Sequence, residues 1–114
     1  MITLKGVDPR MIANNITPYK PTHPGEVIRE EIEYRGITQR RLSVQVGIVQ
    51  PIINELLNGQ RPITSRYALI FEATLGIEAE MLMRMQMRYD MQTIRESKVW
   101  GERLKQLSKR ELIP

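Results

Sequence analysis

Apolar residues recur at three- and four-residue spacing through most of this 114-residue chain, and that period predicts helices. Glycines follow several apolar runs, at Gly36, Gly47, Gly59 and Gly76, where they suit helix ends. No stretch alternates apolar and polar residues for long enough to form a core strand. The pattern therefore predicts an all-α fold. Its helices are expected over 24–35, 39–46, 49–58, 65–75, from near 78, and 98–110.

The same spacing predicts which side chains point inward. One helical face carries each set, and the last expected helix places Trp100, Leu104 and Leu107 together. The predicted core residues are Ile28, Ile32, Leu42, Val46, Ile48, Ile53, Leu56, Leu57, Ala68, Phe71, Leu75, Met81, Leu82, Met85 and Tyr89.

Prolines and the helical pattern divide the chain into three segments. Residues 1–22 are interrupted by three prolines and are expected to form an arm, in which Asp8 and Pro9 suit one short helical turn. Residues 23–95 hold five helices and are expected to form one domain. Residues 96–114 are expected to be a C-terminal helical extension.

Residues 38–59 carry the pattern of a helix-turn-helix. Thr38 suits the N-cap of the first helix, and Gly47 lies at the turn, where a positive φ is expected. The small Ser43 lies where two steeply crossing helices approach most closely, and Ile48 anchors the turn to the core. Further apolar positions follow five and eight residues after Ile48. This arrangement is typical of a DNA-binding motif.

In such a motif the second helix enters the major groove with its N-terminal residues at the base edges. Gln50 is the leading base reader, because a carboxamide pairs bidentately with adenine, and Asn54 is the second. Ile52 is expected to point outward and to contact a thymine methyl. The alternatives are a solvated Gln50 and an exposed Ile52 without a partner. Pro51 leaves one backbone donor fewer for a phosphate, and Val49 occupies an N-cap that Ser or Thr would fill better.

Phosphate contacts are expected around these base readers. Gln39 begins the first helix of the motif, whose N-terminus faces the DNA backbone, and Arg61 follows the second helix. Arg40 and Arg41 add charge, with solvation as the alternative for each. The predicted DNA-binding residues are Gln39, Arg40, Gln50, Pro51, Ile52, Asn54 and Arg61.

The charge pattern agrees with a polyanionic partner. The chain has 17 Lys and Arg against 13 Asp and Glu, a net charge of +4. Residues 34–66 alone carry five arginines against Glu55, whereas 26–33 is acidic. A mixed-sign solvated surface is the alternative.

Composition excludes several other classes of function. The chain has no Cys and a single His, His23, which excludes disulfides, Cys-ligated metals and His clusters. The sequence shows no paired nucleophile and base and no glycine-rich phosphate loop, so an enzyme is not expected. His23, next to Pro24, is expected to begin a helix rather than to act as a base. No cofactor, metal or small-molecule ligand is expected. No apolar run has the length of a membrane span or a signal peptide, so the expected compartment is the cytoplasm.

Apolar residues in excess of one core predict self-association. Leu69 and Ile70 lie beyond the core face of their helix, and Met83 and Met87 do so on the next. A self-complementary patch of this kind suits a twofold dimer. The alternative is a stripe that packs against the helix over 98–110.

Several short motifs together resemble one family. They are His23-Pro24-Gly25-Glu26, Gly36-Ile37-Thr38-Gln39, Leu56-Leu57-Asn58-Gly59, Ala68-Leu69 with Leu75-Gly76, and Arg88-Tyr89-Asp90. With them the chain resembles the HigA antitoxins, of the phage-repressor-like (XRE) helix-turn-helix superfamily, over residues 23–95. The resemblance implies a five-helix, lambda-repressor-like DNA-binding domain.

The resemblance also implies partners. Such proteins dimerise, bind an operator in their own promoter, and neutralise HigB, a small basic toxin that cleaves mRNA. Gln39, Gln50 and Arg61 match the DNA-facing places of the family, whereas the chain departs from it at Val49, usually Ser, and at Pro51.

Toxin contact is expected from the arm 1–22 or the tail 96–114. The acidic residues Glu26, Glu30, Glu31 and Glu33 suit the steering of a basic toxin, with helix-dipole and solubility roles as the alternative. Two other functions compete with the antitoxin. One is a phage-type repressor without a toxin, and the other is a protein-interaction module with a degenerate helix-turn-helix.

Overall fold

The chain is helical throughout the part that the structure describes. The computed structural model describes residues 21–113, so the predicted turn at Asp8 and nearly all of the predicted arm 1–22 lie outside it. Within 21–113 no strand occurs, and none of the helices combines the length and apolarity needed to cross a bilayer. The helices are α1 (Pro24–Arg35), α2 (Gln39–Val46), α3 (Gln50–Leu57), α4 (Ser65–Leu75), α5 (Ala79–Glu96) and α6 (Lys98–Ser108).

The helix ends follow from local residues, as the sequence predicts. Gly36 and Gly47 end α1 and α2 with φ of 72° and 75°, in the left-handed region that favours glycine. The Thr38 hydroxyl accepts a hydrogen bond from the Arg41 backbone N–H at 3.1 Å and so caps α2. Val49 stands at the N-cap of α3 without a side-chain hydrogen bond. Only the ends of α3 and α6 differ from the prediction, by one or two residues.

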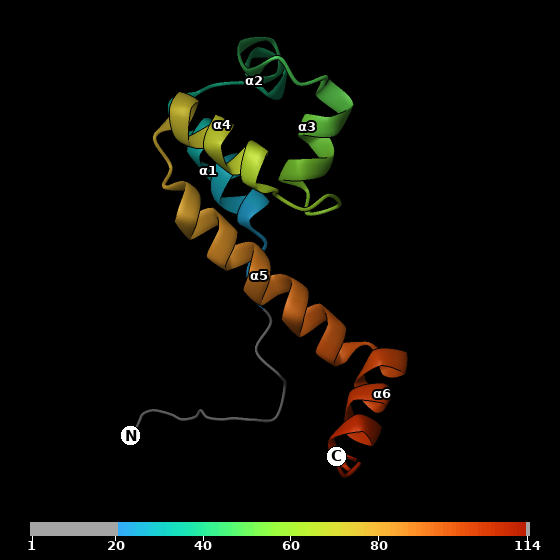
Figure 1. Cartoon of the computed structure of the whole chain (residues 1–114). Coiled ribbons are helices and arrows are strands. Elements are labelled where there is room, and N and C mark those ends of the chain that lie inside the picture. The colour runs from blue at the N-terminus through green and yellow to red at the C-terminus, as the bar shows by residue number, and fades with distance from the viewer. Residues whose placement is uncertain (1–20, 114) are drawn as a thin grey trace, which may run out of the picture.

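Helices α1 to α4 and the first half of α5 surround one core (Figure 1). Helix α5 packs along α4 and α1, while α2 and α3 pack against each other at the opposite end of the domain. The second half of α5 projects away from the domain and leads into α6. Helix α6 contains no buried residue.

The core contains most of the predicted residues and some others. Val46, Ile48 and Met81 lie partly buried against it, and Met85 and Tyr89 are half-buried. Ile63 and Ile77, which lie in connections between helices, were not predicted. The buried hydrophobic residues are Ile28, Ile32, Leu42, Ile53, Leu56, Leu57, Ile63, Ala68, Phe71, Leu75, Ile77, Ala79 and Leu82.

Helix α6 does not join that core. Trp100, Leu104 and Leu107 share its apolar face but are 54%, 42% and 45% exposed. Helix α6 packs on α5, yet Met87 and Met91 of α5 remain 53% and 46% exposed. The alternative of a stripe fully covered by the last helix is therefore wrong for this chain alone, and an apolar surface remains.

The first turn of α1 packs directly onto the end of α3. A Cβ added at Gly25 would lie 1.9 Å from the backbone oxygen of Leu56. No side chain fits in that space, so the contact between α1 and α3 requires glycine at this position.

Substitution of Gly25 by alanine is expected to destabilise the fold strongly. We expect Gly25→Ala to lower the free energy of unfolding by about 3 kcal/mol, because the backbones of α1 and α3 must move apart. The measurement is urea unfolding followed by circular dichroism. Gly36→Ala is the control, because that site has a positive φ and no atom within 4 Å of the added carbon. It should lose only about 1 kcal/mol, and an equal loss in the two variants would contradict the prediction.

Candidate nucleic-acid interface

Helices α2 and α3 form a helix-turn-helix with an exposed second helix. The turn passes through Gly47, and the Ser43 hydroxyl donates a hydrogen bond to the backbone carbonyl of Ile48. Ser43 therefore fixes the turn through its hydroxyl as well as fitting a close helix crossing. Leu42 and Ile53 are fully buried between the two helices and the rest of the core. The N-terminal end of α3 is thus held at the surface by a rigid turn.

The exposed face of α3 carries the predicted base readers. Gln50, Pro51 and Asn54 are all exposed, on successive turns of one face. A shallow hollow follows this face, lined by Gln50, Pro51, Asn54, Glu55 and Gln60. The structure therefore brings together three of the residues predicted to meet DNA.

The expectation that Ile52 points outward with no core to fill is wrong. Ile52 is partly buried and packs against the hydrophobic core. Its neighbour Ile53 is fully buried, and the core extends far enough along α3 to cover part of Ile52 as well. Its burial leaves less of the side chain available to a thymine methyl.

A chain of polar hydrogen bonds joins the predicted interface. The Asn54 amide donates to the Gln39 side-chain oxygen at 3.2 Å, and the Asn58 amide donates to Asn54 Oδ1 at 3.1 Å. Arg29 of α1 donates in turn to Asn58 Oδ1 at 3.0 Å. Both polar atoms of Asn54 thus have protein partners. This arrangement suits Asn54 to holding Gln39 at the start of α2 better than to pairing with adenine, a division that the sequence did not indicate.

The predicted phosphate-binding arginines differ in their surroundings. Arg40 and Arg41 are exposed, and within residues 21–113 neither forms an ion pair. Arg61 instead lies against Glu55, with its Nη2 at 2.8 Å and its Nε at 2.9 Å from Glu55 Oε1. Arg61 therefore points toward α3, with a carboxylate between it and the helix.

Two sequence motifs that lie far apart in the chain meet behind this interface. His23 is 6% exposed, and its Nδ1 accepts a hydrogen bond from the Gly25 backbone N–H at 2.9 Å. The Tyr89 ring stands edge-on to the imidazole, with centroids 4.9 Å apart. The imidazole also lies against Gly59 in the loop after α3, where an added Cβ would be 3.4 Å from His23 Cγ. His23 thus caps α1, as expected, and fixes the loop that carries Arg61.

Gln86 is a buried polar residue that the sequence did not reveal. It is 5% exposed on α5, and its side-chain oxygen accepts a hydrogen bond from the Ile63 backbone N–H at 2.8 Å. Its amide donates to Asp90 Oδ1 at 2.8 Å. The spacing of Gln86 and Asp90, four residues apart on one helix, is the one signal that could have drawn attention to it. Gln86 and His23 together hold the connection between α3 and α4.

The predicted dimer residues are only partly available. Leu69 and Met87 are 57% and 53% exposed, and Ile70 is half-buried. Met83 packs in part against the core, so less of its surface is free for a second chain.

Several solved structures with this arrangement are antitoxins. The chain matches no family model. It is 32% identical over 77 residues to virulence-associated protein I of Dichelobacter nodosus, which covers 67% of this chain and 71% of that protein. Its structure is similar to that of an addiction-module antidote protein of the HigA family from Coxiella burnetii. Their TM-score is 0.67 at 27% sequence identity, over 84% of this chain and 99% of the other.

The chain belongs to the family of virulence-associated protein I, and its fold is that of the HigA antitoxins. The Pseudomonas aeruginosa antitoxin HigA, solved with the higBA promoter, has a TM-score of 0.65 and 25% identity over 83% of this chain and 98% of that one. These structural matches cover more of the chain than residues 23–95 provide. The likeness to solved HigA structures therefore extends beyond the segment on which the sequence resemblance rests.

The state of His23 makes the stability of this fold depend on pH. Burial lowers the pKa of His23 below its usual 6.5, although the carboxylates of Asp90 and Glu26 act in the opposite direction. The unfolded chain therefore binds a proton at a pH where the folded chain does not. Protonation would also remove the Nδ1 lone pair that caps α1.

We expect the free energy of unfolding to be greatest above pH 6.5 and to fall as the pH drops below that value. The slope should reach at most about 1.4 kcal/mol per pH unit for this one group. Urea unfolding between pH 7.5 and pH 5 measures it. His23→Asn is the control, because Asn also caps helices but does not titrate, and His23 is the only histidine. An unchanged slope in this variant would assign the pH dependence to other groups.

Proposed function

We propose that this chain is a DNA-binding antitoxin that represses its own operon as a dimer and neutralises a HigB-type mRNA-cleaving toxin in the cytoplasm. Residues 23–95 act as the DNA-binding domain, and 96–114 act as a helical extension. The observation that carries the proposal is the exposed face of α3, which presents Gln50 beside the bonded pair Gln39 and Asn54. The likeness to a HigA protein solved with promoter DNA supports it.

DNA binding follows from this geometry. Gln50 reads a base edge in the major groove from the first turn of α3, while Gln39 and the backbone at the start of α2 contact a phosphate. Arg40 and Arg61 supply charge to the DNA backbone on either side. Pro51 shapes the first turn of α3, and Ile52 contributes the exposed part of its side chain.

A dimer gives the second recognition helix. Leu69, Ile70, Met83 and Met87 supply apolar surface that a second copy would cover. A twofold axis through such a patch places two α3 helices about 34 Å apart, one turn of DNA. The operator of this chain is therefore a pair of inverted half-sites.

The toxin contact lies away from α3, so that DNA and toxin bind together. The exposed carboxylates Glu26, Glu30 and Glu33 of α1 lie on a different helix from the base readers and attract a basic toxin. The arm 1–22 and the extension 96–114 supply further contacts.

Selection of duplexes from a random 30-base-pair library tests the DNA-binding part. We expect an enriched sequence with two inverted half-sites about 34 Å apart. Gln50→Ala should lower affinity for that sequence by about ten- to a hundredfold and relax selection at one position in each half-site. Gln45→Ala removes an exposed glutamine from α2 and is the matched control. If Gln50→Ala keeps its sequence preference, the chain is a protein-interaction module with a degenerate motif.

Co-expression tests the antitoxin part. We expect the small open reading frame beside this gene to stop the growth of cells, because it encodes an mRNA-cleaving toxin, and this chain to restore growth. Viable counts with and without induction measure the effect. Gln50→Ala should still restore growth, since the toxin contact lies elsewhere. A harmless neighbour, or toxicity without rescue, would leave a phage-type repressor without a toxin as the function.

A further inference from the structure

We propose that Glu55 is a specificity-determining residue of the DNA interface, which acts by holding Arg61 and by repelling phosphates that are out of register. The inference rests on the proposed DNA-binding function. It concerns an acidic residue on the recognition helix, where a carboxylate lowers attraction to any DNA. The ion pair of Glu55 with Arg61, the way the loop around Arg61 is held, the exposure of the pair and the charges around it support the inference.

The ion pair joins α3 to the loop that follows it. Glu55 Oε1 lies 2.8 Å from Arg61 Nη2 and 2.9 Å from Arg61 Nε, so one oxygen receives both donors of the guanidinium edge. Glu55 also lines the hollow beside Gln50 and Asn54, one residue after Asn54 on the helix. The carboxylate therefore stands between the base-reading face and the arginine.

The backbone of Arg61 is fixed independently of this pair. His23 packs against Gly59, two residues before Arg61, and Gln86 accepts from the backbone N–H of Ile63, two residues after it. The Gln60 backbone N–H donates to the Glu55 backbone oxygen at 2.9 Å. With the loop held in this way, the direction of the Arg61 side chain depends on what its guanidinium binds, which is Glu55.

The pair contributes little to folding. Each side chain is 41% exposed, and exposed ion pairs contribute close to nothing to stability because water screens them. Glu55 is also the only acidic residue in 34–66, a stretch with five arginines. A carboxylate at this place weakens binding to every DNA sequence. Glu55 can therefore help the protein only by increasing the difference in affinity between the operator and other sequences.

The two effects of Glu55 oppose each other on the operator, whereas only the repulsion acts on other sequences. On the correct site Arg61 is already held in one rotamer, so it loses little side-chain entropy when it binds its phosphate. This smaller entropy loss offsets the repulsion between the phosphate and the Glu55 carboxylate. On other sequences the recognition helix sits differently, the phosphate is out of reach of Arg61, and only the repulsion remains. Glu55 thus lowers non-specific affinity more than operator affinity.

The experiment compares Glu55→Gln with the full-length wild-type chain on two duplexes. One is the sequence selected from the random library, and the other is a shuffled duplex of the same composition. We expect affinity for the shuffled duplex to rise by about three- to tenfold, because one negative charge is removed close to the DNA backbone. Affinity for the selected duplex should change by less than about twofold, so the specificity ratio falls. In a plot of log affinity for DNA against log salt concentration, the slope should become steeper by about 0.9.

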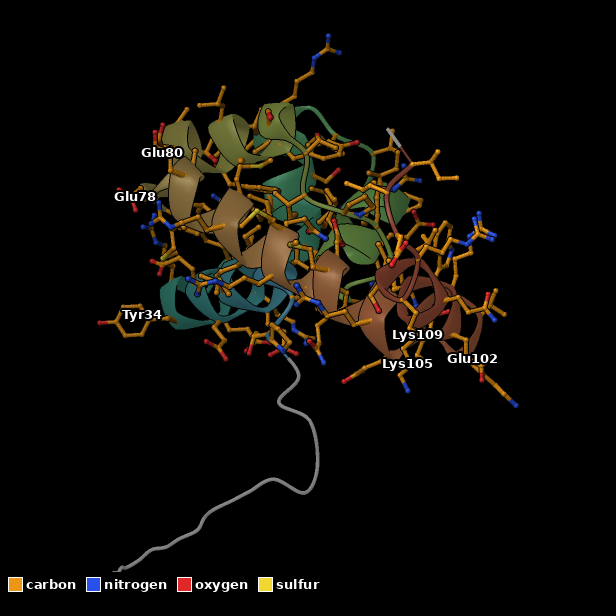
Figure 2. The ribbon with its side chains drawn as sticks, turned by 60° about the horizontal axis from the view of Figure 1, so that its bottom comes forward. Tyr34, Glu78, Glu80, Glu102, Lys105 and Lys109 are labelled. Carbon is orange, nitrogen blue, oxygen red and sulfur yellow. The ribbon has the colours of Figure 1, made fainter. Side chains whose placement is uncertain are left out.

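Two controls separate this role from a general charge effect. Glu80→Gln removes the same charge from the N-terminal end of α5, where Glu80 points into solvent (Figure 2), and should leave the specificity ratio unchanged. Arg61→Gln should weaken binding to the selected duplex much more than to the shuffled one, because Arg61 reaches its phosphate only on the selected site, and it should reduce the salt slope there. In that background Glu55→Gln should no longer change the ratio, because the pair is already broken.

Several results would overturn the inference. One is a specificity ratio that stays within twofold of the wild type or rises in Glu55→Gln, and another is an equal fall of the ratio in Glu80→Gln. A loss of operator affinity confined to one base pair would make Glu55 a base reader instead. If the wild-type chain selects no sequence at all, the proposed function fails and the inference fails with it, an outcome distinct from normal selection with an unchanged ratio.

Discussion

The close approach of α1 to the end of α3 is the constraint on which this structure depends. Gly25 leaves room for the Leu56 carbonyl, and only because the two backbones touch can His23 reach the loop after α3. The same contact brings His23 under Tyr89 of α5. The absence of a side chain at Gly25 therefore allows α1, α3 and α5 to make contact at one place.

That point also prepares the surface for binding. The loop between α3 and α4 is held by His23 and Gln86 from inside the domain, and the side chains of Gln39, Asn54 and Asn58 are bonded to one another outside it. Groups that are already positioned lose less entropy on binding. The candidate interface is thus built from a fixed loop and a fixed helix end, with Gln50, the proposed base reader, exposed on α3.

The charges of the molecule are divided between its elements. Arg40, Arg41 and Arg61 lie on or after the helix-turn-helix, whereas Glu26, Glu30 and Glu33 lie along α1, and Tyr34 extends into solvent from the end of that helix (Figure 2). Glu102, Lys105 and Lys109 mark the mixed charges of α6, at a distance from both. This separation lets the chain offer a cationic surface to DNA and an anionic one to a second partner without one blocking the other.

The sequence by itself determined the helices, their ends and most of the core. Apolar spacing is a local property, and a glycine such as Gly47 or a cap such as Thr38 acts within its own turn. These features can therefore be recognised from the sequence without knowledge of the fold. The motif over 38–59 and the family motifs could be recognised in the sequence for the same reason.

Only the tertiary structure decided which polar side chains meet. Ile52 lies partly against the core, and Gln86 is buried with its side-chain oxygen bonded to the backbone N–H of Ile63, which is far from it in the sequence. The pairing of Arg61 with Glu55 and of Asn54 with Gln39 likewise depends on how helices cross. Such contacts are not predicted by the helical period of any single segment. The sequence shows which polar residues are present, and only the packing of the helices determines which of them meet.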